Sequence, residues 1–213
     1  MNKKYARRPF SLLAPATYRV LRVFATATEG TVQSDLARDA HTSPAQTSRA
    51  IRWMIAHGHA ERQPDGRYRI RGAAGLIASA LPYQRSMADS VHSVVRVRGS
   101  PDEVAARACA ASGVLCLETA LGTYSRFFRP DRVAVYHPKP EELLDSFRAD
   151  EGGLLPLAVY AIDLPLEGDV VPVPERPGLL ATSRFRTVLD MACDGKVYAA
   201  KEVLEELWGA VIG

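Results

Sequence analysis

The sequence lacks the features of a secreted or membrane-spanning protein. Its 213 residues contain no run of about 18 apolar residues, the length that a transmembrane helix needs. The N-terminal stretch MNKKYARRPF carries charges but no apolar segment after them, so it does not have the pattern of a signal peptide. The three cysteines, Cys109, Cys116 and Cys193, are odd in number and form no Cys-x-x-Cys pair. These absences predict a cytoplasmic protein that has no membrane partner and keeps reduced, mostly buried thiols.

The common catalytic and metal-binding patterns are missing as well. The sequence has no Gly-x-Gly-x-x-Gly, no phosphate-binding P-loop and no His-Glu-x-x-His. His57 and His59 form an isolated close pair, which is more typical of a helix end than of a metal site. Gly99-Ser100 and Asp102 resemble the start of a nucleotidyltransferase motif, but the second carboxylate of that motif is absent. We therefore expect no enzyme activity, no catalytic residues and no bound metal or cofactor.

Charge is distributed unevenly along the chain, although the formal net charge is only +3. Residues 1–72 hold 13 Lys and Arg against 5 Asp and Glu, whereas residues 73–213 hold 14 against 19. The opposite net charges of these two parts of the chain predict two domains with different partners. A basic first domain suits a polyanion, because each neutralised phosphate releases counterions. The alternative is that small domains often depart from neutrality without a functional reason.

One stretch, Ser43 to Gly58, contains signals for both ends of a helix. The hydroxyl of Ser43 can accept from the free amides of the first turn, and Pro44 suits the first helical position. Gln46 stands three residues after the cap, as in a capping box. Gly58 supplies the left-handed residue that ends many helices.

The two faces of this helix differ in chemistry. Helical spacing predicts a core-facing side made of Thr47, Ile51, Met54 and Ile55. The other side carries small, amide or guanidinium groups, namely Ala45, Gln46, Ser48, Arg49 and Arg52. Arginine can bind guanine edges or phosphates, and glutamine can pair with adenine. A solvated helix face with no ligand is the alternative interpretation.

Two more helices are expected before this stretch. Apolar residues recur at helical spacing over residues 16–26, and Thr31-Val32 is expected to form a minimal strand. Ser34 is expected to cap a second helix over residues 35–40. Together with the helix that follows Ser43, this arrangement predicts a helix-turn-helix whose second helix takes the recognition position.

A hairpin is expected directly after the recognition helix. Residues 59–62 and 66–70 have the alternation of strands, and Gln63-Pro64-Asp65-Gly66 has the composition of a turn. Its outward side chains are the cations Arg62, Arg67 and Arg69. The order of these elements predicts a winged helix-turn-helix domain over residues 15–74.

A basic arm, residues 1–14, precedes this domain. Its cations are Lys3, Lys4, Arg7 and Arg8. Such arms can follow a phosphate backbone or enter a minor groove. A solubilising tail without a nucleic-acid partner is the alternative.

Residues 75–213 are expected to form a second domain in which strands and helices alternate. The pattern predicts strands at 94–97, 114–117, 132–136 and 157–162, separated by helices that begin near residues 101, 118 and 138. A proline-rich loop is expected over residues 165–177, followed by two C-terminal helices over 183–193 and 199–211. The predicted fold class is α+β, with a small mixed sheet of α/β type in this second domain.

Three segments carry a resemblance to a known family. VQSDLARDAHTSPAQTSRAIRWMIAHGHAER resembles the DNA-binding part of MarR-like and antitoxin-type regulators. GVLCLETALGTYSRFFRPDRVAVYH and ATSRFRTVLDMACDGKVYAAKEVLEELWG, the latter with Asp190, are similar to segments of AbiEi-type antitoxins. The resemblance implies a regulator commonly encoded with a nucleotidyltransferase-like toxin, in which the winged helix represses transcription. It implies no catalytic residues.

Two functions from different classes follow. The first is a DNA-binding transcriptional regulator, acting as a homodimer on double-stranded DNA, because one winged helix contacts few base pairs. Its predicted DNA-binding residues are Ser43 and the exposed face of the following helix, the three hairpin arginines and the cations of the arm. The second is a protein-interaction antitoxin module, in which the acidic second domain binds or neutralises a toxin partner.

Overall fold

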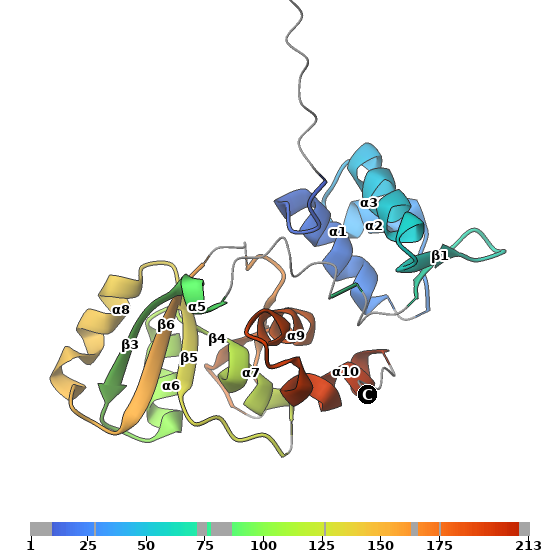
Figure 1. Ribbon diagram of the computed structural model, residues 1–213. Helices are drawn as coiled ribbons and strands as arrows, with labels where there is room; N and C mark the ends of the chain where they lie inside the picture. The colour runs from blue at the N-terminus through green and yellow to red at the C-terminus, as the bar shows by residue number, and fades with distance from the viewer. Residues whose placement is uncertain are drawn as a thin grey trace, which may run out of the picture. The chain divides into compact units, whose positions relative to one another are not determined.

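The computed structural model describes residues 10–27, 29–71, 76–77, 87–125, 127–162, 166–174 and 176–208. The chain divides into two compact units, Met1–Gly72 and Ala73–Gly213, and its fold class is α+β (Figure 1). The cations of the predicted arm, Lys3, Lys4, Arg7 and Arg8, lie outside the described residues.

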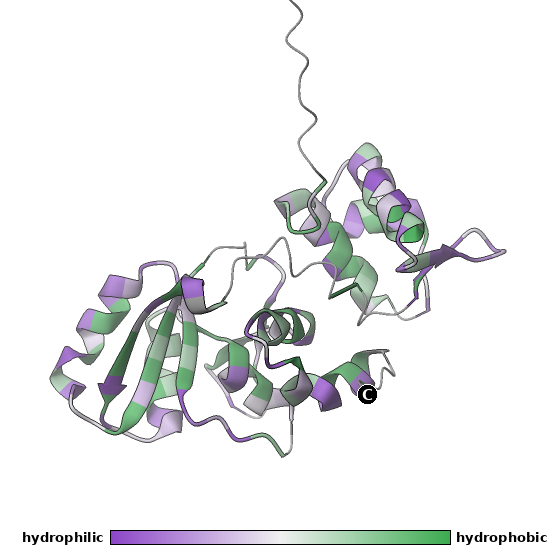
Figure 2. Ribbon diagram, in the orientation of Figure 1, coloured by the Kyte–Doolittle hydropathy of each residue, from purple (hydrophilic) through white to green (hydrophobic). Residues whose placement is uncertain are grey.

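The described part of the first unit consists of three helices and a two-stranded antiparallel hairpin. Its elements are α1 (Pro15–Thr26), α2 (Gln33–Asp39), α3 (Pro44–Ala56), β1 (Ala60–Arg62) and β2 (Tyr68–Ile70). The three helices pack against one another through buried apolar side chains, which include Leu21, Phe24, Leu36, Ile51 and Met54. In Figure 2, α1 is largely hydrophobic and the hairpin is largely hydrophilic.

Both predicted ends of α3 are confirmed. Ser43 Oγ accepts from the Gln46 amide at 3.2 Å, and Gln46 Oε1 accepts from the Ser43 amide at 3.5 Å, which is a complete capping box. Gly58, just after the helix, has φ +74°. The predicted burial is right for Thr47, Ile51 and Met54, but Ile55 is 39% exposed. The buried stripe also includes Ala50. At 100° per residue, Ile55 lies about 90° around the helix axis from the centre of this stripe.

The start of α2 differs from the prediction. Ser34 lies inside the helix, which begins at Gln33, and the N-cap position is Val32 with no side-chain cap. The reason is the preceding residue: Thr31 and Tyr68 exchange two backbone hydrogen bonds, of 2.9 and 2.7 Å. This bridge to β2 holds the chain extended up to Val32, so the helix starts directly from an extended segment.

Replacing Ser43 by alanine is expected to destabilise the first unit by about 1 kcal/mol, because the Gln46 amide loses its acceptor. Urea unfolding followed by Trp53 fluorescence, in a Trp208→Phe background, measures this change. Ser48→Ala is the matched control, since Ser48 lies within α3 and takes no part in its cap. An unchanged unfolding free energy for Ser43→Ala would contradict the role given to the cap.

The second unit is built on a six-stranded mixed sheet of strand order β3-β6-β5-β4-β8-β7. The pairs β5/β6 and β4/β8 are parallel, and the other neighbours are antiparallel. Its strands are β3 (Val91–Val97), β4 (Val114–Leu115), β5 (Val133–His137), β6 (Leu155–Ala161), β7 (Val170–Pro172) and β8 (Leu180–Thr182). Its helices are α5 (Met87–Ser90), α6 (Pro101–Ala110), α7 (Leu117–Tyr124), α8 (Pro140–Phe147), α9 (Arg184–Cys193) and α10 (Lys201–Trp208), with short 3-10 turns η2 (Arg148–Asp150) and η3 (Val197–Ala200).

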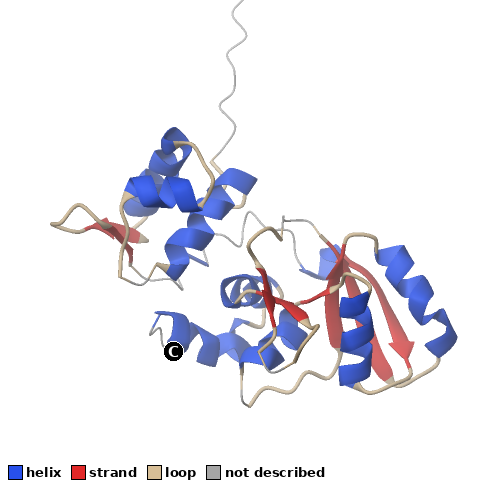
Figure 3. Cartoon of the chain, turned by 180° about the vertical axis from the view of Figure 1, so that it is seen from behind, coloured by secondary structure: helices blue, strands red, loops and turns tan. Residues whose placement is uncertain are grey.

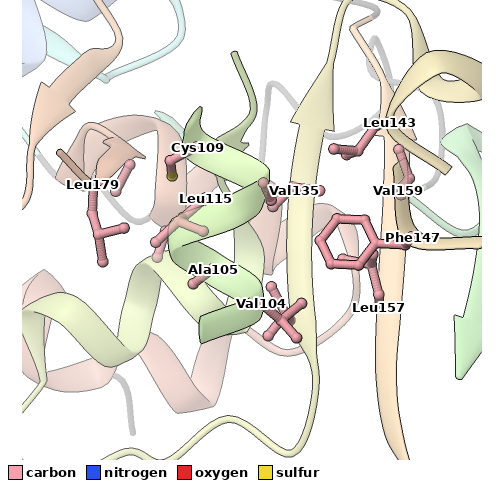
Figure 4. Close-up of a cluster of buried hydrophobic side chains, with 14 of the residues drawn as sticks. Val104, Ala105, Cys109, Leu115, Val135, Leu143, Phe147, Leu157, Val159 and Leu179 are labelled. Atoms are coloured by element: carbon pink, nitrogen blue, oxygen red, sulfur yellow. The ribbon is translucent and has the colours of Figure 1, made fainter. Parts of the chain in front are cut away.

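Helices cover both faces of the central strands. α6 and α8 lie on the same face of the sheet (Figure 3), where Val104 and Phe147 pack against Val135 and Val159 (Figure 4). α7 and α9 pack together, and α7 contacts β5. Every residue of β5 is buried, because alternate side chains face the two helical layers.

The region expected to be a proline-rich loop contains a strand. β7 pairs with β8, and the sequence pattern predicted neither strand. Among the described strands, β7 lies at the edge of the sheet and pairs with β8 alone, so Pro172 does not interrupt a central ladder. Cys116, expected in a strand, instead occupies the N-cap position of α7, because β4 ends at Leu115.

Candidate nucleic-acid interface

The exposed face of α3 has the side chains that the sequence predicted for it. Ala45, Gln46, Arg49 and Arg52 are exposed and Ser48 is half-buried. Within the described part of the chain, Arg49 makes no hydrogen bond or ion pair. Arg52 Nε donates to the Ser48 carbonyl of the preceding turn at 3.3 Å. Both guanidinium groups therefore point away from the core, with donors available to a ligand.

Two of the predicted contact residues are already used to hold the helix end. The Ser43 hydroxyl accepts from the Gln46 amide and also lies 3.3 Å from Gln46 Oε1. The carboxamide oxygen of Gln46 is therefore engaged in the capping box, and its NH₂ group is the part that remains for a base edge. The cap therefore fixes the position at which α3, with its exposed side chains, begins.

The hairpin presents three further arginines. Arg62, Arg67 and Arg69 are all exposed. The turn that joins β1 and β2 is closed by the Gly66 amide, which donates to the Gln63 carbonyl at 3.0 Å, and Gly66 has φ +84°. Arg67 lies 3.6 Å from Asp65 at the tip, whereas Arg62 and Arg69 have no ion pair among the described residues. Figure 2 shows hydrophilic residues along this hairpin.

Carboxylates are absent from α3, and most of those elsewhere in the described part of the first unit are paired. Asp35 and Asp39 of α2 both pair with Arg38, at 2.9 Å. Glu61 of β1 accepts from Gln63 at 2.7 Å and lies 3.9 Å from Arg71. Among the described residues, no carboxylate pairs with Arg49 or Arg52 of α3, or with Arg62 or Arg69 of the hairpin.

A stack of rings at the C-terminal half of α3 was not foreseen. The rings of Phe10 and Trp53 are stacked with centroids 5.4 Å apart, and those of Trp53 and His57 are 4.0 Å apart. His57 Nδ1 lies 2.8 Å from the Trp53 carbonyl. Burial and the neighbouring His57 lower the pKa of His59. Trp53 and His57 are four residues apart on one helix, and this spacing could have predicted their contact from the sequence. The contact between Phe10 and Trp53 is tertiary and has no such signal.

The residues weighed for other chemistry have structural roles. Ser100 caps α6 and accepts from the Glu103 amide, and Asp102 pairs with Arg176. Burial raises the pKa of Cys116 well above its usual range and that of Cys193 to about 12, so neither thiol is a thiolate at neutral pH. Among the described residues, no cluster of three or more His, Cys, Asp or Glu is arranged to hold a metal ion.

None of the helices in the described part of the chain has the length and apolar character needed to cross a membrane. Comparison with protein-family models, with curated proteins and with solved structures finds no match to this chain.

Proposed function

We propose that the first unit is a winged helix-turn-helix that binds double-stranded DNA, and that the protein is a transcriptional regulator. The observation that carries this proposal is the coincidence, on one small unit, of an exposed α3 face bearing Arg49 and Arg52 with a hairpin bearing three exposed arginines. A major groove admits one α-helix, and arginine binds guanine edges or phosphates there. The hairpin is proposed as the wing that contacts the phosphate backbone.

The arm is proposed as a third contact. Phe10 stacks on Trp53 of α3, so the described chain starts beside the recognition helix. Lys3, Lys4, Arg7 and Arg8 precede it in the sequence by a few residues. Short basic arms of this kind bind in the minor groove next to the site of a recognition helix.

The remaining parts of the proposal concern assembly and location. A homodimer is proposed, because two winged helices on a repeated half-site discriminate among sequences better than one. The resemblance to AbiEi-type antitoxins supports a repressor that acts on its own promoter in the cytoplasm. No catalytic role is proposed for either unit.

The direct test is binding of the purified protein to DNA upstream of its own gene and to random DNA, at two salt concentrations. We expect specific binding that weakens with salt, because phosphate contacts release counterions. Equal binding to both DNAs would contradict a sequence-specific regulator. Absence of binding to both would contradict a DNA-binding role for the first unit.

Arg69→Ala is expected to weaken binding about equally for specific and random DNA and to reduce the slope of log affinity against log salt by about 1, as for a phosphate contact. Arg69 has no ion-pair partner among the described residues, so its positive charge is available to a phosphate group. Titrations by fluorescence anisotropy at four salt concentrations give the slope. Arg148→Ala, an exposed arginine of the second unit that pairs with Asp145 at 2.5 Å, is the control. An unaltered slope in Arg69→Ala would show that Arg69 makes no phosphate contact.

A second candidate function is the binding of a basic partner protein by the second unit. Phe127 is 87% exposed and lines a shallow groove of about 450 Å³ together with Lys201, Glu202 and Glu205 of α10, where the two carboxylates outnumber the one cation. An exposed aromatic ring beside carboxylates suits a basic surface. Co-expression with the product of the adjacent gene tests it: a complex that Phe127→Ala and Glu205→Lys both weaken supports this function. A complex that is lost on removing residues 1–72 would contradict it.

A further inference from the structure

A cleft in the second unit has the character of a binding site for a small anion. It has a volume of about 510 Å³, within the range of small-molecule sites in proteins. Its walls come from four parts of the unit: the start of α6, the β4–α7 segment, the residues that lead into β5, and Arg176. The apolar side chains that line it are Pro101, Ala105, Leu115, Phe128, Pro130 and Val133.

The polar lining is dominated by guanidinium groups. Arg129, Arg132 and Arg176 line the cleft, and Asp102 is the one carboxylate among its described lining residues. Arg132 is neutralised by the buried Glu118 outside the lining, so Arg129 and Arg176 against Asp102 leave the cleft with a net positive charge that favours an anion such as a phosphate. Guanidinium groups bind phosphate oxygens through paired, charge-assisted hydrogen bonds.

The wall that carries Arg132 is held in place by buried groups. Arg132 Nη2 donates to both oxygens of Glu118 at 2.8 Å, and the Glu118 side chain is 6% exposed. Thr119 Oγ1 donates to the Arg132 carbonyl at 3.1 Å and accepts from the Ala134 amide at 2.8 Å. A Cβ on Gly122 would lie 3.0 Å from Pro130, so α7 and this wall are in close contact. The cleft is therefore preorganised on this side.

Arg176 differs from Arg132 in that its ion pair is exposed. Its partner, Asp102, has a side chain that is 80% exposed, and exposed ion pairs contribute little to stability. A phosphate can therefore replace the Asp102 carboxylate at Arg176 at little cost. The amides at the start of α6 are less available, because Ser100 and Glu103 form a complete capping box there. The arginines, rather than the helix end, are the groups that can hold an anion.

We propose that this cleft binds a small organic phosphate, of the size of a nucleoside monophosphate. Arg129 and Arg176 contact the phosphate, Arg132 forms a fixed wall through its pair with Glu118, and the apolar lining receives the body of the ligand. The proposal is independent of the proposed DNA binding, because every lining residue belongs to the second unit.

The test uses the full-length chain, labelled with ¹⁵N, and titrations with AMP, ribose 5-phosphate, inorganic phosphate and adenosine at constant ionic strength. We expect the three phosphates to shift the amide signals of Thr119 and Gly122 and the Nε signal of Arg176. Adenosine should bind at least about tenfold more weakly than AMP, which is the loss of one charge-assisted contact. No shift of these signals with any of the three phosphates at millimolar concentration would overturn the proposal. Shifts confined to α3 and the hairpin would also overturn it.

Variants separate the site from general attraction to a basic protein. Arg176→Ala is expected to weaken AMP binding at least about tenfold. Asp102→Asn should tighten it several-fold, because it removes the competing carboxylate and leaves the fold unchanged. Arg148→Ala, which removes an exposed charge outside the cleft, should leave AMP affinity unchanged. Equal affinity in Arg176→Ala and the parent, or weaker binding in Asp102→Asn, would contradict the assigned roles.

Discussion

Arg49→Ala is expected to weaken binding to the specific DNA site by about 5- to 150-fold, the range for losing one base-edge contact of about 1–3 kcal/mol. Arg49 is exposed on α3, where helical geometry places it on the same side as Arg52 and away from the buried Thr47–Met54 stripe. Because it has no partner within the described residues, the substitution removes no intramolecular contact and should leave the fold intact.

Measurement against a panel of DNA sites distinguishes a base contact from a phosphate contact. Loss of preference at one base position identifies Arg49 as a base-reading residue, whereas uniform weakening across the panel would identify a phosphate contact. Arg148→Ala is again the matched control for removing one exposed arginine. If Arg49→Ala binds the specific site as tightly as the parent, the assignment of Arg49 as a base-reading residue is wrong.

Asp190→Ala is expected to destabilise the second unit by about 3–5 kcal/mol, because it leaves the charge of Arg186 buried without this carboxylate. Arg186 Nε donates to Asp190 Oδ1 at 2.8 Å, and the two side chains are 1% and 0% exposed. Arg186 Nη2 also donates to the hydroxyl of Tyr136 on β5 at 3.1 Å. Burial raises the pKa of Tyr136 well above its usual range, so this hydroxyl stays neutral beside the pair.

Hydrogen exchange of the β5 amides reports unfolding of the second unit and measures this loss. Asp145→Ala is the control, since its ion pair with Arg148 is exposed and should contribute no more than about 1 kcal/mol. The double variant Arg186→Met/Asp190→Leu should recover much of the stability, because replacing a buried pair by apolar groups is often neutral. Equal losses of stability in Asp190→Ala and Asp145→Ala would show that the buried pair contributes no more to stability than the exposed pair.

The sequence predicted the first unit well where local signals were strong. The cap at Ser43, the left-handed Gly58 and the turn that ends at Gly66 each depend on residues within a few positions of one another. Backbone conformation at such sites follows from side-chain hydrogen bonding and from the freedom of glycine, both of which are local properties. The start of α2 could not be predicted in this way, because the bridge between Thr31 and Tyr68 decides it.

The second unit shows where sequence patterns are insufficient. The alternation of strands and helices was predicted for most of the sheet, but β7 and β8 were not, since each is three residues long and is stabilised by its neighbour. Arg186 and Asp190 are four residues apart, which is also the spacing of an exposed helical ion pair. Only the packing of α9 within the unit buries them.

The sequence by itself determined the α+β composition, the separation of charge between the two parts of the chain and the arginine-bearing faces of α3 and the hairpin. These follow from residue type, spacing and local turn chemistry. The tertiary structure alone decided which charges are neutralised, that Arg186 and Asp190 lie in the core, and that Arg129, Arg132 and Arg176 meet around one cleft. The physical reason is that burial and ion pairing depend on contacts between residues far apart in the chain, such as the 74 positions that separate Arg176 from Asp102.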